Sequence, residues 1–455
     1  MSEHRADVVV LGGGSGGYAA AIRAAELGKS VVLIEEEKVG GTCLHRGCIP
    51  TKALLHAAEV ADTVRGAAKF GVGAALTGVD PAAVHAYKDA VVGRLHKGLQ
   101  GLLDAHDIEI VRGRGRFVEA TTVTVGSDLY TGEHLVLATG SRPRALSGIE
   151  IGGNVLSSDD ALTLDRIPED AVVLGGGVIG VEFASIWASL GVKVTVLEAL
   201  DRLVAGEDEF CSKHLARGLR KRGVTAKTGV TVTGVKQDDD GIIVELGSGA
   251  ALEAEVLLVA VGRQPNTEDF AETPVGLDRG FVRTDARLRT TVPHVYAVGD
   301  IVAGPQLAHR GFAHGIFVAE DIAGLDPVPV DDDAVPRVTY SHPEVASVGL
   351  TEARARERFG DGVRTVVYDL AGNGKSQILG TAGAVKLIQD PSGTVAGMHM
   401  VGDRVSELIG EAQILYGLGV PVADAARLVH AHPTQGEAIG EALLAMAGSP
   451  LHVHQ

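Results

Sequence analysis

Asp7-Val8-Val9-Val10-Leu11-Gly12-Gly13-Gly14-Ser15-Gly16-Gly17 is the stretch of this chain that decides its fold. The β-branched residues before the glycines predict a short buried strand. An alanine-rich pattern from Tyr18 to Leu27 predicts a helix, and Ser30 to Ile34 predicts a second strand that ends at Glu35. Strand, glycine turn, helix and strand in this order indicate a dinucleotide-binding βαβ unit.

Gly12, Gly14 and Gly17 match the G-x-G-x-x-G pattern. The pattern alone is weak, because glycine is 61 of 455 residues and about one such match is expected by chance. Its position between a strand and a helix carries the inference. Glycines there let backbone N–H groups and the helix N-terminus approach a pyrophosphate, and the Glu35 carboxylate at the next strand end can hold a ribose.

The same arrangement occurs a second time in the middle of the chain. A strand is predicted from Ala171 to Leu174, followed by a turn that contains Gly175, Gly177 and Gly180. A helix to Leu190 and a strand from Lys193 to Leu197 follow, and Glu198 ends the unit. Two complete units imply two dinucleotide sites.

Glu198 bears on the choice between NAD and NADP at the second site. A carboxylate at this strand end suits an unphosphorylated ribose 2′-OH, whereas a 2′-phosphate calls for arginines. The residues Ala199, Leu200 and Asp201 follow, so NAD is favoured. Arg202 is close enough in the sequence to leave NADP open.

Two of the three cysteines, Cys43 and Cys48, lie five positions apart directly after the first unit. Random placement would bring some pair to that separation in about one per cent of sequences, so coincidence is a poor explanation. A close pair in a cytoplasmic protein is catalytic or metal-binding more often than structural. Because only His45 and His56 are near enough to complete a metal site, we expect no metal here. A helix is predicted from Lys52 to Arg65.

Length and charge exclude several classes of protein. A chain of 455 residues is too long for one core and suggests roughly three domains. The formal net charge of −17 argues against nucleic-acid binding and favours a soluble, cytoplasmic protein. The longest apolar run, from Ala171 to Leu197, contains Glu182, Lys193 and several glycines, so we expect no membrane span.

The last third of the chain adds one candidate for acid–base chemistry. Pro327 to Pro336 is predicted to be a linker, and strands and helices alternate from Arg337 to Gln455. Near the end, His432 is followed by Glu437, and a histidine held by a carboxylate is a ready general base. Taken alone, this segment indicates a structural histidine more than a catalytic one.

Taken together, the motifs resemble the flavin-dependent pyridine nucleotide-disulfide oxidoreductases, and the resemblance covers essentially the whole chain. In chain order the motifs are Gly12 to Gly17, Gly40 to Lys52, Ala138-Thr139-Gly140, Gly175 to Gly180, Ala297 to Asp300, Ser341 to Gly349 and the His432-Pro433 segment. Within the family, the chain is most similar to the members that oxidise protein-bound dihydrolipoamide in 2-oxoacid dehydrogenase complexes.

The resemblance implies an α/β fold with two Rossmann-like domains, for FAD and NAD, and a C-terminal α+β dimerisation domain. The FAD domain would be discontinuous, with segments 1–147 and 267–335. The NAD domain would be residues 148–266, and the dimerisation domain residues 336–455. The implied partners are a second copy of the chain and a lipoyl-bearing acyltransferase.

The resemblance also implies a set of site residues. Those expected to hold FAD are Gly12, Gly14, Gly17, Glu35, Gly41, Thr42, Lys52, Thr139, Gly140 and Asp300. Those expected to hold NAD are Gly175, Gly177, Gly180, Glu198 and Gly262. The residues expected to be catalytic are Cys43, Cys48, Lys52, Glu182, His432 and Glu437.

The implied reaction passes two electrons from dihydrolipoamide to NAD. His432 of one subunit would deprotonate the substrate, Cys43 would face the substrate and Cys48 the flavin, and Lys52 would pair with Glu182. His45 stands where family members commonly have asparagine, and we expect a surface histidine there. Two alternatives stay open: a reductase of another small disulfide, such as glutathione or mycothiol disulfide, and a flavoprotein that has lost catalysis.

Overall fold

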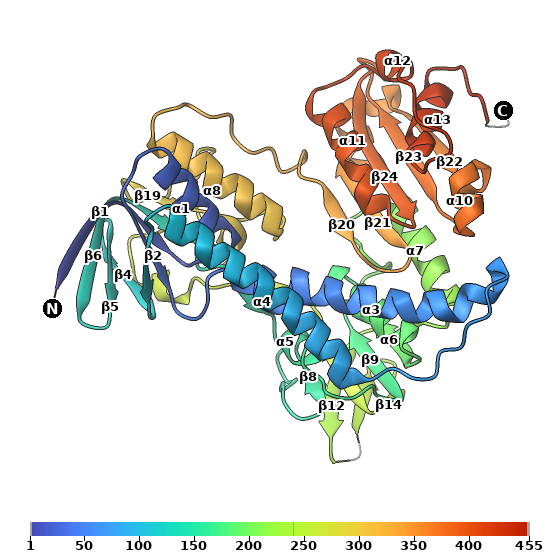
Figure 1. The fold of residues 1–455 in the computed structure, drawn as a ribbon, viewed down its shortest axis with the longest axis horizontal. Coiled ribbons are helices and arrows are strands. Elements are labelled where there is room, and N and C mark those ends of the chain that lie inside the picture. The colour runs from blue at the N-terminus through green and yellow to red at the C-terminus, as the bar shows by residue number, and fades with distance from the viewer. Residues whose placement is uncertain (1, 240, 453–455) are drawn as a thin grey trace.

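The computed structural model of the protein describes residues 2–239 and 241–452 and contains three units, each built around a β-sheet (Figure 1). The α/β class that the resemblance implies is confirmed. Within the described ranges, no helix is long and apolar enough to span a membrane.

The first unit contains a seven-stranded sheet in the order β3-β2-β1-β6-β5-β4, with β19 beside β6. Its strands are β1 (Glu3–Leu11), β2 (Val31–Glu35), β3 (Glu109–Arg112), β4 (Gly115–Glu119), β5 (Thr122–Val125), β6 (Asp128–Leu137) and β19 (Val295–Ala297). Helices α1 (Ser15–Glu26) and α8 (Ala308–Ile322) pack side by side on it (Figure 1). Because β19 and α8 come from far along the chain, this unit is discontinuous.

The second unit contains a parallel five-stranded sheet in the order β11-β10-β9-β15-β8. Its strands are β8 (Val155–Leu156), β9 (Asp170–Leu174), β10 (Lys193–Leu197), β11 (Thr225–Lys227) and β15 (Val256–Val259). An antiparallel sheet of β12 (Val232–Gln237), β13 (Ile242–Leu246) and β14 (Ala251–Ala254) lies beside it. The helices are α5 (Ser158–Ala161), α6 (Val178–Ser189) and α7 (Glu209–Lys221). Helix α6 is buried almost all round, which explains its near-continuous apolar sequence.

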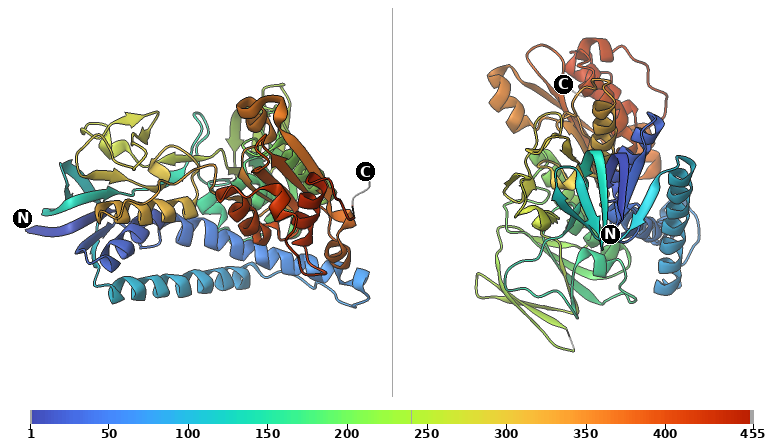
Figure 2. Two further views of the ribbon diagram at one scale, coloured as in Figure 1. Left: turned by 90° about the horizontal axis from the view of Figure 1, so that it is seen from above. Right: turned by 90° about the vertical axis from the view of Figure 1, so that its left-hand side faces the viewer.

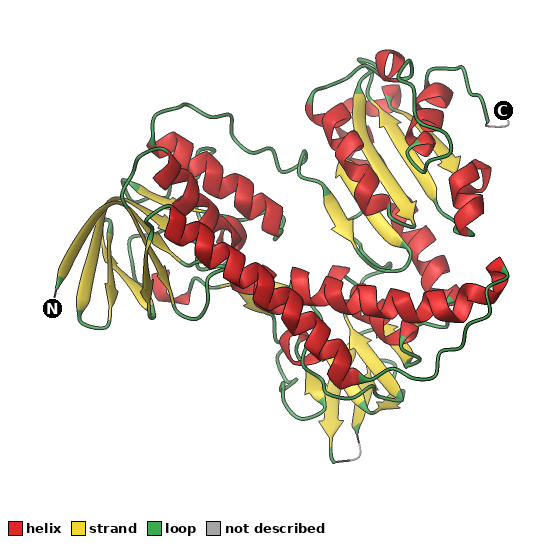
Figure 3. Cartoon of the chain, viewed as in Figure 1, coloured by secondary structure: helices red, strands yellow, loops and turns green. Residues whose placement is uncertain are grey.

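The third unit is an antiparallel sheet covered by helices (Figure 3). The strand order is β20-β21-β24-β23-β22. The strands are β20 (Arg337–Thr339), β21 (Glu344–Gly349), β22 (Arg364–Asp369), β23 (Ala384–Gln389) and β24 (Val395–Gly402). The helices are α9 (Glu352–Phe359), α10 (Gly374–Leu379), α11 (Val405–Gly417), α12 (Val422–Ala425) and α13 (Glu437–Met446).

Two long helices connect these units. Helix α3 (Cys48–Gly66) packs against α6 of the second unit. It also runs alongside α4 (Pro81–Ala105), as Figure 2 shows from above. It begins four residues earlier than the predicted start at Lys52. Pro50 falls in the first turn, where a helix N–H has no partner within the helix, so proline does not interrupt it. Cys48 therefore becomes the first residue of α3.

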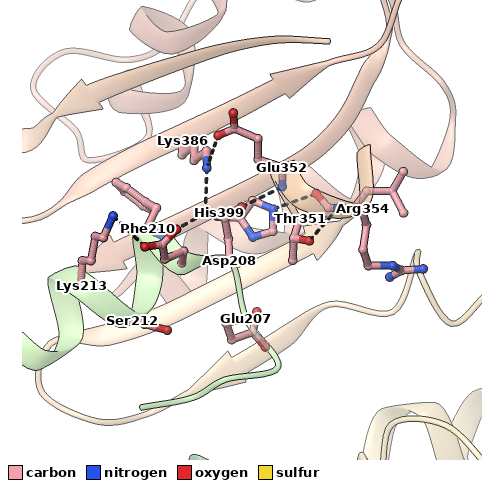
Figure 4. Close-up of polar contacts among 12 residues, drawn as sticks. Glu207, Asp208, Phe210, Ser212, Lys213, Thr351, Glu352, Arg354, Lys386 and His399 are labelled. Carbon is pink, nitrogen blue, oxygen red and sulfur yellow. Dashed lines mark hydrogen bonds and ion pairs between the residues drawn. The ribbon is translucent and has the colours of Figure 1, made fainter. Parts of the chain in front are cut away.

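A buried ionic cluster joins the second and third units (Figure 4). Lys386 on β23 donates to Asp208 at 2.7 Å and pairs with Glu352 at 2.8 Å. The side chains of Lys386 and Asp208 are 8% and 3% exposed. Asp208 also accepts backbone N–H groups from Phe210 and Glu352. Burial raises the pKa of Asp208, but the hydrogen bond from Lys386, followed by these backbone donors, outweighs burial and lowers it.

Lys386→Met is expected to lower the free energy of unfolding by about 3 kcal/mol, because it leaves the Asp208 carboxylate buried without its cation. Urea unfolding at a fixed protein concentration measures this loss. The matched control is the double variant Lys386→Met with Asp208→Asn, which removes both charges and should recover part of the stability. Equal losses in the single and double variants would contradict the charge explanation.

Candidate active site around the Cys43–Cys48 pair

Both glycine turns are shaped to admit a ligand at a helix N-terminus. Gly12 has φ +106°, and a Cβ there would lie 2.3 Å from the carbonyl oxygen of Ala138. A Cβ on Gly17 would lie 1.8 Å from the Gly12 carbonyl oxygen, so this position has to be glycine. By contrast, a Cβ on Gly14 would meet nothing closer than the Gly41 Cα at 3.9 Å. The middle glycine thus faces open space at the start of α1, which fits a pyrophosphate.

The second turn repeats this geometry. A Cβ on Gly175 would lie 2.3 Å from the Ala260 carbonyl oxygen, and one on Gly180 would lie 1.9 Å from the Gly175 carbonyl oxygen. Around Gly177 there is nothing within 4 Å. Gly262, the last residue predicted for this site, has φ +106° and also faces open space. The second turn therefore fits a dinucleotide by the same test.

The strand-end carboxylates occupy equivalent places in the two units. Glu35 accepts N–H groups from Gly13 at 2.7 Å and from Glu37 at 2.8 Å. Glu198 accepts N–H groups from Gly176 at 2.6 Å and from Leu200 at 2.8 Å. Each carboxylate is thus held at its glycine turn by backbone donors, in the position that a ribose would require.

Arg202 is the residue whose position in the sequence left NADP as a possible cofactor. In the structure its guanidinium binds other groups. Its guanidinium donates to the carbonyl oxygens of Ala205 at 2.7 Å and of Glu207 at 3.1 Å. A third contact reaches Ser212 Oγ at 3.4 Å. Because its donors are directed into the following loop, Arg202 is poorly placed to bind a 2′-phosphate beside Glu198.

The residues predicted around the flavin come together from four segments. A Cβ on Gly41 would lie 2.6 Å from the Gly14 Cα, so the segment from Gly40 to Lys52 passes directly over the first glycine turn. Thr139 Oγ1 donates to the Asn266 carbonyl oxygen at 2.7 Å, next to Gly140, which has φ +69°. The Asp300 carboxylate lies at the start of the segment that follows β19.

Ser141 and Arg263, which were not predicted as site residues, link Asp300 to Thr42 by hydrogen bonds. Ser141 Oγ donates to Asp300 Oδ2 at 2.5 Å and accepts Arg263 Nε–H at 2.7 Å. The Arg263 guanidinium also reaches Thr42 Oγ1 at 3.5 Å. The segments Ala138-Thr139-Gly140-Ser141 and Gly262-Arg263 can be recognised in the sequence. No feature of either segment indicates that the two meet in the fold.

Cys43 lies on the short helix α2 (Gly41–Arg46), and Cys48 is the first residue of α3. Both are free thiols, partly buried and hydrogen-bonded to each other. The hydrogen bond from Cys43 lowers the pKa of Cys48 to about 7, with burial opposing and the Lys52 charge assisting. The same hydrogen bond and burial raise the pKa of Cys43. Of the two thiols, Cys48 is therefore the one that ionises first.

Lys52, one helical turn after Cys48, pairs with Glu182 of α6. Its Nζ lies 2.9 and 3.0 Å from the two carboxylate oxygens. The Glu182 side chain is 4% exposed and also accepts the Tyr340 N–H at 2.9 Å. Burial opposes the charge of Lys52, but Glu182 outweighs burial and the pKa of Lys52 is raised. Lys52 therefore stays cationic beside Cys48.

Tyr18 and Tyr340, which were not predicted as site residues, also belong to this region. Burial and, less strongly, the charges of Cys43 and Cys48 raise the pKa of Tyr18 to about 12. Tyr18 lines a hollow of about 500 Å³ between α1 and α8, together with Phe312 and Ile316. The Tyr340 ring lies 4.7 Å from Lys52 Nζ. A single aromatic residue has no motif or spacing in the sequence that would predict a position near the cysteines.

His432 and Glu437 form the expected pair in the third unit. His432 Nδ1 lies 2.8 Å from Glu437 Oε1, and Glu437 Oε2 accepts the Thr434 N–H at 2.8 Å. Because a carboxylate only accepts, Nδ1 carries the proton and Nε2 presents its lone pair. The His432 side chain is 74% exposed in the single chain. The free nitrogen is thus available to a group outside this subunit.

His45 is half-buried rather than a surface residue. Its Nε2 lies 2.9 Å from the Val39 carbonyl oxygen, and its ring makes an edge contact with His96 at 4.9 Å between centroids. Burial lowers the pKa of His45. The expectation of an exposed histidine is therefore wrong, since α4 covers this side of α2.

In the dithiol form, alkylation by iodoacetamide is expected to rise with pH up to about 7 and then level off. The reason is that the hydrogen bond from Cys43 and the charge of Lys52 keep Cys48 ionised above that pH, whereas an ordinary cysteine ionises near about 8.5. Lys52→Met should move the midpoint to higher pH. A profile that keeps rising to pH 9, or one that Lys52→Met leaves unchanged, would contradict this assignment.

Comparisons with known proteins agree with this geometry. Residues 6–315 match the family model for pyridine nucleotide-disulphide oxidoreductases, and residues 335–443 match the dimerisation domain of the same family. The chain is 40% identical to a dihydrolipoyl dehydrogenase of Bacillus subtilis, over 98% of this chain and 99% of that protein.

Solved structures show the same fold. LpdA from Mycobacterium tuberculosis superposes with a TM-score of 0.90 at 24% identity, over 97% of this chain and 99% of that one. The flavoprotein disulfide reductase RclA from Escherichia coli gives 0.87 at 27% identity, over 98% and 100%. With both of its domain models matched in order and a relative at 40% identity over nearly its full length, the chain belongs to the pyridine nucleotide-disulphide oxidoreductase family.

Proposed function

We propose that the protein oxidises protein-bound dihydrolipoamide to lipoamide and reduces NAD⁺, as the E3 component of a 2-oxoacid dehydrogenase complex. The observation that carries the proposal is the Cys43–Cys48 pair, with Cys48 as the first residue of α3 and the Lys52–Glu182 ion pair one helical turn later. Several relatives named dihydrolipoyl dehydrogenase match 98% of the chain and support the same activity.

The first step is proton transfer from the substrate. His432 Nε2, free because Nδ1 donates to Glu437, takes the proton of one dihydrolipoamide thiol. Only the resulting thiolate attacks a disulfide efficiently. The exposed position of His432 suits a site completed across the dimer, and we propose that it serves the cysteines of the partner subunit.

The second step is thiol–disulfide exchange in the oxidised enzyme. The substrate thiolate attacks Cys43 Sγ, the Cys43–Cys48 bond breaks, and Cys48 leaves as a thiolate stabilised by Lys52. The second substrate sulfur then attacks the one bonded to Cys43 and closes the lipoamide ring. Cys43 leaves with the second substrate proton, so two electrons remain on the Cys43–Cys48 dithiol.

The cofactors of the family are FAD and NAD. When bound, FAD would accept two electrons from the cysteine pair, and NAD, with its pyrophosphate at the second glycine turn, would accept a hydride. We propose that FAD is held by Gly12, Gly14, Gly17, Glu35, Gly41, Thr42, Lys52, Thr139, Gly140 and Asp300. We propose that NAD is held by Gly175, Gly177, Gly180, Glu198 and Gly262. The Lys52–Glu182 pair keeps a cation beside the place where reducing equivalents leave Cys48.

The dimerisation domain indicates a homodimer. We propose FAD-domain segments 1–147 and 267–335, an NAD domain of residues 148–266 and an interface domain of residues 336–455. The proposed partner is a lipoyl-bearing acyltransferase. The acidic composition supports a cytoplasmic location.

An anaerobic titration of the holoenzyme tests the activity. Dihydrolipoamide should bleach the flavin absorbance, and NAD⁺ but not NADP⁺ should restore it. In steady state, NADH with lipoamide should turn over, whereas NADPH with glutathione disulfide or mycothiol disulfide should not. Turnover with either of these disulfides and none with lipoamide would replace the proposal by a small-disulfide reductase. No turnover with any of them would indicate a flavoprotein without catalysis.

A further inference from the structure

The loop 427–436, which carries His432, contains a second histidine–carboxylate pair. His430 Nε2 lies 2.8 Å from Glu411 Oε1 on α11. The two side chains are 16% and 34% exposed, whereas His432 is 74% exposed. Two residues of the same loop thus have opposite environments, and the mechanism uses only the exposed one.

The His430 ring is also packed against α13. A Cβ on Gly440 would lie 2.6 Å from His430 Nδ1 and 2.9 Å from its Cε1. Gly436, directly before α13, faces the same ring, with a Cβ position 3.9 Å from His430 Cδ2. The imidazole therefore fills the space between α11 and the first turn of α13 and allows no side chain at position 440.

The first turn of α13 is where His432 is oriented. Glu437 begins this helix and binds both His432 Nδ1 and the Thr434 N–H. Downstream of His432, the loop is held by Asn373 Nδ2, which donates to the Thr434 carbonyl oxygen at 2.9 Å. Upstream of His432, it is held by His430. A shift of either anchor would change the angle at which His432 Nε2 is presented.

We propose that His430 is a positioning residue for His432, because it fixes loop 427–436 to α11 through Glu411 and sets the place of α13 through Gly440. This inference rests on the proposed role of His432 as the base for a dithiol substrate. Since the Glu411 carboxylate only accepts, His430 Nε2–H donates, and an amide N–H of glutamine can take its place. Alanine provides no donor and leaves a space beside Gly440.

The test uses the holoenzyme with the variants His430→Ala and His430→Gln. Two rates are compared: dithiol oxidation with NAD⁺, which needs His432, and NADH oxidation with ferricyanide, in which electrons leave the flavin without passing the cysteines. His430→Ala should lower kcat for dihydrolipoamide about 10- to 100-fold, because general-base catalysis depends on geometry. The ferricyanide rate should stay within about twofold, and His430→Gln should restore most of the dithiol rate.

The matched control is His452→Ala. His452 pairs with Glu441 on the same helix α13 at 2.7 Å, but it is 60% exposed and makes no hydrogen bond or ion pair with loop 427–436 within the described part of the chain. Its charge contributes only weakly at Glu437, so His452→Ala should change the dithiol rate much less than His430→Ala does and should leave the ferricyanide rate unchanged. If His430→Ala does not give a folded dimer, Glu411→Ala removes the same hydrogen bond from the more exposed partner and should show the same divergence of the two rates.

Parallel loss of both rates would make His430 merely structural and would overturn the inference, as would an unchanged dithiol rate in both His430→Ala and Glu411→Ala. Failure of the proposed function is seen separately, as absent dihydrolipoamide turnover in the wild-type enzyme. The ratio of the dithiol rate to the ferricyanide rate is then measured with dithiothreitol as the dithiol, since its two thiols are the same reacting groups.

Discussion

His432→Gln is expected to slow dihydrolipoamide oxidation by about two to four orders of magnitude, the range that a positioned general base contributes. The loss follows because glutamine has no lone pair of suitable basicity where His432 Nε2 presents one. Because the substrate proton must be removed before the sulfur can attack, kcat and kcat/KM should fall together. Steady-state kinetics with NAD⁺ measure both constants.

NADH oxidation by ferricyanide is the internal control for His432→Gln. This rate should change less than about twofold, since neither the cysteines nor His432 takes part in it. The exposed place of His432 in the single chain means that the substitution leaves no cavity in this subunit. If the rate of dihydrolipoamide oxidation fell by less than about tenfold, another group would have to take the proton.

Cys48→Ser is expected to remove disulfide-dependent turnover to background while leaving a folded, yellow protein. A serine hydroxyl cannot form the bond to Cys43 that stores the oxidising equivalents, so the exchange has no electrophilic sulfur. The side chain is small and partly exposed, and the substitution keeps its volume nearly constant. Lipoamide turnover, flavin content and the ferricyanide rate are the three measurements.

Cys211→Ala is the matched control for Cys48→Ser. Cys211 is wholly buried in the apolar core of the second unit, and burial raises its pKa, so it takes no part in exchange. Its removal should leave lipoamide turnover intact apart from a modest loss of stability. Retained turnover in Cys48→Ser would remove the cysteine pair from the mechanism.

The two Rossmann-like units could be predicted from the sequence because their signals are local. A β-branched strand, a glycine turn and an alanine-rich helix are each dictated by residues within about 25 positions. The Cys43–Cys48 spacing is local too. Helix α3 begins four residues before the predicted start at Lys52, because the first turn of a helix tolerates Pro50.

Other parts of the site came from the family resemblance rather than from the residues. Lys52 and Glu182 are 130 positions apart and meet only because α3 packs against α6. Taken alone, the sequence around His432 indicated a structural histidine. Its exposed ring, held by Glu437, is consistent with the catalytic role that the resemblance implies. No periodicity or spacing in the sequence could have paired these groups.

By itself, then, the sequence determined the two glycine-turn units and the close spacing of Cys43 and Cys48, because neighbouring residues decide turns, helices and strands. Only the tertiary structure decided that Arg202 turns into its own loop, that His45 lies under α4, that Arg263 reaches Ser141 and that His430 anchors the loop of His432. These contacts depend on how whole elements pack, and packing places side chains together that are distant in the chain.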